Sequence, residues 1–211
     1  MAVRKDIMNS KNFFNQVANQ WDEMRKGFFS DRVRDMALNK ANVQSGELAA
    51  DIGAGTGFIT EALIKKDINV IAVDRSESMI TALRAKFNTL DCRIGNAEEI
   101  PIENGMVDYV FANMCLHHVE TPLIAIKEMA RILKTGGTLV ITDLDEHTFE
   151  FLRTEHHDRW MGFKREDIES WFNEAGLKNI MIESLEENCC ASSKCGCQDA
   201  AANIFVATGN K

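Results

Sequence analysis

From about residue 47 onward, short apolar runs alternate with stretches in which apolar residues recur at helical spacing. Continuous apolar runs are typical of strands that are buried on both faces of a parallel sheet. The runs are ELAADIG at 47–53, NVIAVD at 69–74, CRIG at 92–95, VDYVFAN at 107–113 and TLVITDL at 138–144. Because strands and helices alternate, the sequence predicts an α/β fold with a doubly wound, mostly parallel sheet.

Helical patterns fill the segments between these runs. One helix is expected over 57–66 and another after Ser76, whose hydroxyl suits a helix N-cap. A third should begin at Thr121 and Pro122, because proline fits the first helical position, and end at two glycines, 136 and 137. Two further helices are predicted over 147–160 and 163–176, and candidate strands lie at 180–185 and 203–207.

The region ahead of the first strand predicts two helices within residues 10–41. Apolar residues share one face of the first helix: Phe13, Val17, Trp21 and Met24. Gly27 interrupts this pattern, and Ser30 can cap the second helix. These helices either form a lid over the sheet or only cover its edge. We expect one domain over 1–211, with a helical cap at 1–45 and a core at 46–211.

Composition and charge narrow the classes of protein. The 211 residues are 45% hydrophobic and 27% charged, which is ordinary for a globular domain, and the net charge is −8. An acidic surface disfavours binding to nucleic acid or to anionic membranes. The first residues lack the apolar core of a signal peptide, and no apolar run reaches the length of about 18 residues that suggests a membrane span. We therefore expect a cytoplasmic protein.

The sequence DIGAGTG at 51–57 follows the first strand and precedes a helix, which is the arrangement of a nucleotide-binding turn. Its three glycines should let a ligand approach the main-chain N–H groups with no Cβ in the way. A dinucleotide fingerprint requires G-x-G-x-x-G, but here the glycines follow G-x-G-x-G and Phe58 takes the place of the last glycine. Asp51 would repel a pyrophosphate, whereas it can accept a hydrogen bond from an ammonium group. A ligand with a cationic amino-acid end is therefore favoured over NAD, which leaves a dehydrogenase as a distant alternative.

DIGAGTG resembles the first motif of the class I S-adenosylmethionine (SAM) methyltransferases. Three further segments match that family in order and spacing: Asp74 at the end of the second strand, GNA at 95–97 and Asn113 at the end of the fourth strand. The family usually has Gly-Asp-Ala where this chain has GNA. The resemblance implies a seven-stranded sheet whose last strand lies antiparallel beside the fifth, and SAM as the cofactor.

The resemblance also implies roles for individual residues. Asp74 would accept from the ribose hydroxyls, although it could instead cap the next helix, and Asn96 would accept from the adenine amino group. The segment FNQVANQWDEMR resembles the N-terminus of quinone-biosynthesis-like methyltransferases, which suggests that Trp21 covers the cofactor and Arg25 pairs with its carboxylate. The implied SAM-binding residues are Asp51, Gly53, Gly55, Gly57, Asp74, Arg75, Met79, Asn96, Ala97 and Asn113.

Histidines are the candidate catalytic residues. All five lie between 117 and 157, and His117 and His118 come directly after the fourth strand, at the edge where ligands bind in open α/β sheets. A neutral imidazole is a suitable general base near pH 7. The alternative is that one of the two only packs in the core. We expect His156 and His157 to be surface residues of a helix.

Four of the six cysteines cluster in a loop at 189–197: Cys189, Cys190, Cys195 and Cys197. If this loop follows a sixth parallel strand, its thiols lie at the cofactor edge together with Cys115. Grouped thiols suit a soft ion such as trivalent arsenic. The chain resembles the arsenite methyltransferases in layout, but their cysteines are dispersed. A zinc site, a disulfide or redox pair, and no chemical role all remain open for this loop.

The sequence thus predicts a SAM-dependent methyltransferase that acts on a small molecule, including a thiol or a thiophilic metalloid such as arsenite. The alternative is a thiol-based metal- or metalloid-binding protein on the same fold. Expected partners are a small-molecule substrate, with neither nucleic acid nor membrane. A homodimer, and a metal or metalloid ion at the cysteine loop, remain open.

Overall fold

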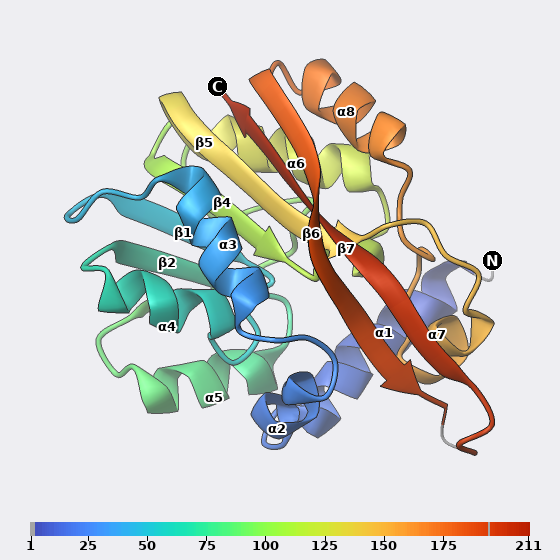
Figure 1. Ribbon diagram of the computed structural model, residues 1–211. Coiled ribbons are helices and arrows are strands. Elements are labelled where there is room, and N and C mark those ends of the chain that lie inside the picture. Colours follow the sequence, from blue (N-terminus) through green and yellow to red (C-terminus); the bar gives the residue numbers. More distant parts are fainter. Residues whose placement is uncertain (1–2, 194) are drawn as a thin grey trace.

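The computed structural model describes residues 3–193 and 195–211, with side chains described from Ser10 onward. A central seven-stranded sheet has the order β3-β2-β1-β4-β5-β7-β6 (Figure 1). Its strands are β1 (Leu48–Ile52), β2 (Asn69–Asp74), β3 (Asp91–Ile94), β4 (Val107–Asn113), β5 (Leu133–Leu144), β6 (Lys178–Ser192) and β7 (Asp199–Asn210). Only β7 runs antiparallel to its neighbours, β5 and β6. The predicted doubly wound α/β fold is confirmed.

Helices cover both faces of the sheet (Figure 1). One face carries α3 (Arg32–Ala41), α4 (Phe58–Lys65) and α5 (Glu77–Lys86), and the other carries α6 (Pro122–Ile132) and α8 (Arg165–Glu174). Neighbouring strand residues face opposite cores: Phe111 packs with α3, and Val110 packs with α6 and α8. Because both sets of alternating side chains are buried, β4 is a continuous apolar run in the sequence. Among the described residues, no helix has the length and apolar character needed to cross a bilayer.

Three short helices gather at the carboxyl ends of the parallel strands: α1 (Val3–Val17), α2 (Trp21–Lys26) and α7 (Glu150–Glu155) (Figure 1). Hydrogen bonds fasten the first two to the loops after β1 and β2. Ser76 Oγ donates to Asn15 Oδ1 at 2.6 Å, and Thr56 Oγ1 donates to Asp22 Oδ1 at 2.6 Å. The segment therefore contains three helices rather than the two predicted, because the chain breaks at 18–20 as well as near Gly27. The third, α3, packs on the sheet face and is not part of a lid.

Several predicted boundaries in the second half of the chain were wrong. The helix expected to reach the glycines at 136 and 137 ends at Ile132, because Leu133 already pairs with Val107 of β4. Gly137 lies inside β5, where an added Cβ would sit 2.8 Å from the carbonyl oxygen of Asp108. The predicted helix over 147–160 is reduced to α7, and β6 and β7 form a hairpin far longer than the candidate strands at 180–185 and 203–207.

Candidate functional site

A pocket that we call the glycine-turn pocket opens above the carboxyl ends of β1, β2 and β4. It encloses about 900 Å³, counting the solvent at its mouth. This edge is where ligands bind in open α/β sheets. The predicted binding residues that line it are Asp51, Gly53, Gly55, Asp74, Arg75, Met79, Asn96, Ala97 and Asn113. Nine of the ten predicted residues thus meet at one cavity, and only Gly57 does not line it.

The backbone of the glycine turn is hydrogen-bonded within the protein. The N–H groups of Gly53 and Ala54 both donate to the carbonyl oxygen of Val73, at 2.8 and 3.1 Å, and Gly57 N–H donates to the carbonyl of Ala54 at 2.9 Å. Gly55 N–H donates to Asp74 Oδ2 at 2.8 Å. The expectation that these N–H groups point at a ligand was therefore wrong. Because a pyrophosphate needs such donors, this turn is built for a ligand without one.

The glycines of the turn instead provide space. An added Cβ at Gly55 would meet nothing closer than the indole nitrogen of Trp21, at 3.6 Å, so this position stays open to a ligand. An added Cβ at Gly53 would lie 2.4 Å from Cys115 Sγ, and one at Gly57 would lie 2.5 Å from Leu83. Gly57 therefore serves the packing of α4 against α5, and Gly55 is the glycine that shapes the cavity.

Two carboxylates line the glycine-turn pocket together with the guanidinium groups of Arg25 and Arg75. Asp74 Oδ2 accepts from Gly55 N–H and its Oδ1 accepts from Ser76 N–H, both at 2.8 Å. Asp51 is buried, and its Oδ2 accepts from the N–H and hydroxyl of Thr60, at 3.0 and 2.6 Å. Burial raises the pKa of Asp51 to about 6 despite these bonds, and removal from solvent also raises the pKa of Asp74. Near these two carboxylates, a cationic group of a ligand is favoured over a pyrophosphate.

The alternative role for Asp74 as a helix cap is not realised. Ser76 is the N-cap of α5, and its hydroxyl accepts from the N–H of Met79 at 3.2 Å. Asp74 stands before the helix and fixes the backbone on both sides of the pocket edge. Each carboxylate oxygen keeps a second lone pair that can accept from a ligand hydroxyl.

The other predicted residues occupy the rest of the wall. Asn96 is exposed and its amide nitrogen donates to Glu98 at 3.2 Å, which orients the amide oxygen as the remaining acceptor. Asn113 Oδ1 accepts from Thr142 Oγ1 at 2.7 Å. Met79 is 1% exposed, so it is part of the core as well as of the wall.

The two lid residues suggested by the resemblance differ in their surroundings. Trp21 of α2 lines the pocket and lies against the open side of Gly55. Arg25 also lines it, but its guanidinium forms an ion pair with Asp31 at 3.2 Å and lies 4.0 Å over the ring of Phe58. Arg25 is thus already partnered within the chain, whereas Trp21 is placed to cover a ligand.

A second cavity, the histidine pocket, adjoins the first. Its wall is mostly aromatic and aliphatic, and it also includes three imidazoles and the carboxylate of Asp158. Cys189 of β6 also reaches it. The two pockets share five lining residues: Phe14, Trp21, Phe29, Met114 and His118. The two pockets therefore meet at these side chains.

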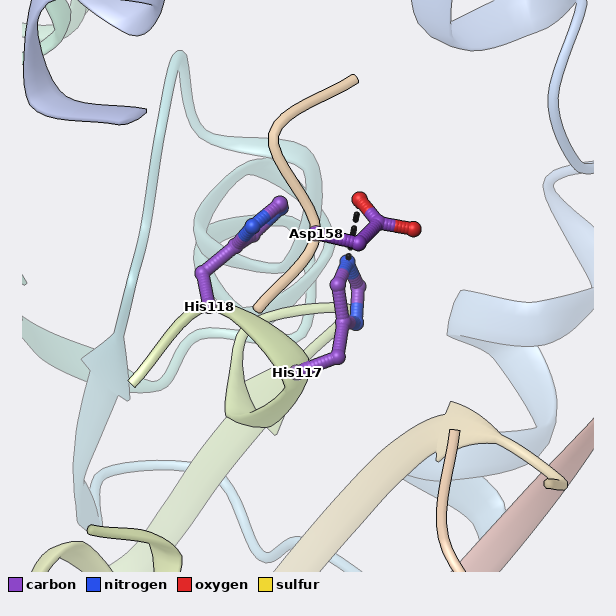
Figure 2. A group of neighbouring side chains, drawn as sticks. All are labelled: His117, His118 and Asp158. Atoms are coloured by element: carbon purple, nitrogen blue, oxygen red, sulfur yellow. Dashed lines mark ion pairs between the residues drawn. The ribbon is translucent and has the colours of Figure 1, made fainter. Parts of the chain in front are cut away.

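His117 is held between two buried carboxylates. Its Nδ1 lies 2.7 Å from Asp143 Oδ1. Its Nε2 faces Asp158 Oδ1 at 3.8 Å (Figure 2). The N–H groups of Leu116 and Leu144 also donate to Asp143, at 2.9 and 2.8 Å. Burial opposes the charged form of His117, but the two carboxylates outweigh it and raise its pKa to about 9.

His118 lies at the junction of the two pockets. Its Nδ1 is 3.4 Å from the carbonyl oxygen of His157, and its ring packs edge-on against Phe14 with centroids 5.0 Å apart. Burial and the neighbouring charge of His117 lower its pKa well below the ordinary value. The structure thus brings both predicted histidines to the same cavity, with opposite shifts in pKa.

Asp158 is a residue that the sequence did not single out. The string HHDRW was interpreted as helical, with His156 and His157 on the surface. In the structure α7 ends at Glu155, and His157 takes a positive φ of 63°. The chain turns there, so that Asp158 is only 6% exposed and His156 lines the histidine pocket. The run of three ionisable residues at 156–158 was the sequence signal that could have pointed to Asp158.

The four late cysteines have three different environments. Cys189 lines the histidine pocket, Cys190 is exposed on the other face of β6, and Cys195 forms a disulfide with Cys197. Residue 194 of this loop lies outside the described residues. The disulfide agrees with one alternative left open above, and it removes two thiols from the predicted four-cysteine metal site. Burial raises the pKa of Cys115 and of Cys189 to about 12, so both are thiols near pH 7.

Sequence comparison places part of the chain in a known family. Residues 50–141 match the family model described as a methyltransferase domain. The 2-methyl-6-phytyl-1,4-hydroquinone methyltransferase of Spinacia oleracea is 32% identical over 165 residues, covering 75% of this chain and 48% of that protein. The chain thus spans about half the length of this curated relative.

Solved structures share the fold at low sequence identity. One is a chain of the complex between the Haloferax volcanii Trm112 methyltransferase activator and a methyltransferase, with a TM-score of 0.76, 21% identity, and coverage of 93% of this chain and 96% of that one. Another is Haemonchus contortus phosphoethanolamine N-methyltransferase 2 in complex with SAM, with a TM-score of 0.70, 18% identity, and coverage of 84% and 52%. Residues 50–141 are thus similar to a methyltransferase domain, and the chain has the fold of these solved methyltransferase structures.

Proposed function

We propose that this protein transfers a methyl group from SAM in the glycine-turn pocket to a small molecule in the histidine pocket. The observation that carries this proposal is the shared wall of the two cavities. Methyl transfer requires donor and acceptor in line and in contact, without water between them. Two adjoining cavities that share Phe14 and His118 meet this requirement.

The glycine-turn pocket suits SAM in shape and in charge. The open side of Gly55 allows close approach of a nucleoside, and the carboxylate of Asp74 suits a pair of ribose hydroxyls. The sulfonium and ammonium groups of SAM are cationic, which fits a cavity with two carboxylates. The internal bonding of the turn's N–H groups is no obstacle, because SAM has no phosphate.

SAM supplies a methyl group that its positive sulfur already activates. The chain has to orient the acceptor, exclude water and, for a protonated nucleophile, remove a proton. Phe14 and Trp21 can cover the junction between the pockets. We assign His117 and His118 to the nucleophilic atom of the acceptor, because both line the histidine pocket and His118 also lines the glycine-turn pocket.

The wall of the histidine pocket favours an apolar acceptor that carries one polar atom. Phe13, Phe28, Leu144 and Leu152 supply apolar surface, and the rings of His117 and His118 lie side by side in the same wall, with centroids 4.0 Å apart. The spinach relative is named for a hydroquinone, which is a compound of this kind. A hydroquinone or another phenol is therefore the first acceptor class that we propose.

One observation favours a second candidate acceptor, a thiol or a thiophilic metalloid such as arsenite. Cys189 lines the histidine pocket and Cys115 lines the glycine-turn pocket. Against it, both groups are neutral thiols near pH 7 because burial raises the pKa of each to about 12. The related alternative, a thiol-based metal-binding protein without transferase activity, has the same support.

Turnover distinguishes these acceptors. Release of S-adenosylhomocysteine is measured with purified protein and SAM, in parallel with hydroquinones, simple phenols, and arsenite plus a thiol reductant. We expect product with the hydroquinones or phenols and none with arsenite. If arsenite were methylated and the hydroquinones and phenols were not, the second acceptor class would be correct and the first would be wrong. Failure to bind SAM would overturn the proposed function as a whole.

A bulky side chain in the histidine pocket should weaken binding of the acceptor and leave binding of SAM unchanged. Ala191 lines this pocket, so Ala191→Trp should lower kcat/KM for the acceptor by about tenfold or more, roughly 1.4 kcal/mol, with SAM affinity unchanged. Ala201→Trp is the matched control, because Ala201 is exposed on the paired strand. Equal effects of the two substitutions on kcat/KM would show that the acceptor binds elsewhere.

SAM affinity should depend on the ionisation of Asp51. Its pKa of about 6 means that the carboxyl is neutral at pH 5 and charged at pH 7. Because the carboxylate form attracts a cationic ligand, affinity should rise about tenfold between these pH values, close to one pKa unit of energy. Calorimetric titration with S-adenosylhomocysteine, which keeps the ammonium group, measures this. Asp51→Asn should flatten the dependence, and an unchanged slope in that variant would assign it to another group.

A further inference from the structure

We propose that His117, His118 and Asp158 bind a divalent transition-metal ion of the zinc class in the histidine pocket. One ring nitrogen from each histidine and one oxygen of Asp158 lie within 4.8 Å of one another (Figure 2). The three side chains come from the turn after β4 and from the segment after α7, which are far apart in the sequence. The fold, and not a local motif, brings them together.

The separations suit ligands around one ion. Two ligand atoms that each bind zinc at about 2.1 Å lie about 3.4 Å apart in a tetrahedral arrangement. His117 Nε2 and Asp158 Oδ1 are 3.8 Å apart, which is too far for a hydrogen bond and close to this value. Small side-chain rotations would bring all three groups to coordination distance.

The neighbours of the histidines are those that metal-binding histidines have. A metal-bound imidazole normally donates its second ring N–H to a carboxylate or a backbone carbonyl. His117 Nδ1 lies 2.7 Å from Asp143, and His118 Nδ1 lies 3.4 Å from the carbonyl oxygen of His157. Each ring thus has one nitrogen directed at an oxygen acceptor, which leaves Nε2 as the other nitrogen of each imidazole.

Charge in the cavity also favours a cation. Asp143 is 0% exposed and Asp158 is 6% exposed, and the single imidazole of His117 separates them. Two buried carboxylates need compensating positive charge, because an unpaired charge in the interior is costly. Either a proton on His117 or a bound dication can supply this charge, and the experiment below distinguishes them.

The donor set indicates which ion would bind. Two imidazole nitrogens and one carboxylate suit zinc and its neighbours in the first transition row, whereas magnesium and calcium prefer oxygen ligands alone. Three protein ligands leave a coordination position open, as in catalytic zinc sites. Cys189 lines the same cavity and is the nearest candidate for a thiolate ligand, so its contribution has to be tested.

A consequence for catalysis rests on the proposed function. An ion at this position would coordinate the hydroxyl of a phenolic acceptor and lower the pKa of that hydroxyl. The phenolate would then stand beside the glycine-turn pocket, where His118 lines both cavities. Metal binding itself does not depend on this step.

The test is metal binding by the purified full chain. Zinc content is measured by mass spectrometry, and Co²⁺ is titrated into metal-free protein while its visible absorption is recorded. We expect one equivalent of metal in the wild type and no intense thiolate-to-cobalt band in the near ultraviolet. Loss of second-sphere partners weakens metal sites by about 10–100-fold, so Asp158→Asn and His118→Gln should each weaken binding by at least about 100-fold.

Two controls separate this site from others. His156→Gln changes another imidazole of the same pocket, and the double substitution Cys195→Ser and Cys197→Ser removes the loop disulfide. Neither change should alter metal affinity. Wild-type affinity in Asp158→Asn, loss of binding in the loop variant, or absence of binding by the wild type would overturn the proposal. Binding of S-adenosylhomocysteine, measured in the wild type and in Asp158→Asn, should be the same, because Asp158 lines only the histidine pocket. Failure of the metal site and failure of the proposed function therefore remain distinguishable.

Discussion

Gly55→Arg is expected to abolish binding of SAM and S-adenosylhomocysteine in calorimetric titration. Gly55 has a φ of +54°, and its added Cβ would point at the cavity with only Trp21 nearby, at 3.6 Å. An arginine side chain there would occupy the space of the nucleoside and bring a positive charge to a site for a cationic ligand. A wild type with micromolar affinity should fall below detection, a loss of at least about 100-fold, or roughly 2.7 kcal/mol.

Gly46→Arg provides the matched control for this substitution. Gly46 also has a positive φ, of +85°, and an added Cβ there would meet nothing within 4 Å. It is exposed at the turn before β1, away from the pocket, so the backbone strain of a non-glycine residue is reproduced without the steric effect. Retention of binding by Gly55→Arg would contradict the assignment of this pocket.

Asp74→Ala is expected to weaken binding by about 10–100-fold, or 1–3 kcal/mol, the usual cost of leaving polar groups without a partner. The substitution removes the acceptor for the ribose hydroxyls and also the acceptor of Gly55 N–H and Ser76 N–H. Both effects act on the same edge of the cavity. Calorimetry measures the affinity. The melting temperature shows whether loss of the two backbone hydrogen bonds destabilises the fold.

Asp74→Asn helps to separate these two effects. Its amide keeps one oxygen acceptor, so it should retain more affinity than alanine does. Asp91→Ala, which removes an exposed carboxylate at the start of the neighbouring strand β3, should bind as the wild type does. If Asp74→Ala bound S-adenosylhomocysteine with unchanged affinity, the ribose role would be wrong even if the fold were intact.

The central strands could be predicted from the sequence because their signal is local. The apolar runs at 69–74 and 107–113 coincide with β2 and β4 as they are in the structure. The length of the strands at the edge of the sheet was harder to predict. β6 continues to Ser192 because Cys190 pairs with Ala201 and Ala191 with Ala200, and no pattern within either segment announces that pairing. Strand pairing between distant segments depends on tertiary context.

The residues of the glycine-turn pocket could also be predicted, because they follow strands at one edge of the sheet. Their detailed roles could not. The sequence suggested that the turn offers its N–H groups to a ligand, whereas Val73 and Asp74 accept them in the structure. Backbone hydrogen bonds of this kind depend on the register between β1 and β2, which the motif does not encode.

The histidine pocket shows the limit of motif reasoning most clearly. His117 and His118 were found because they follow β4, but Asp158 was missed because the turn at His157 was interpreted as helix. The apolar wall combines Phe14 from α1 with Leu152 from α7. Residues from such distant elements become a site only once the chain is folded.

A crystal structure with S-adenosylhomocysteine tests the central claim most directly, namely that donor and acceptor meet where the two pockets join. We expect the ribose beside Asp74, the adenine near Ala97, and the sulfur directed past His118 into the histidine pocket. A nucleoside bound elsewhere, or a sulfur that points away from the histidine pocket, would contradict the account.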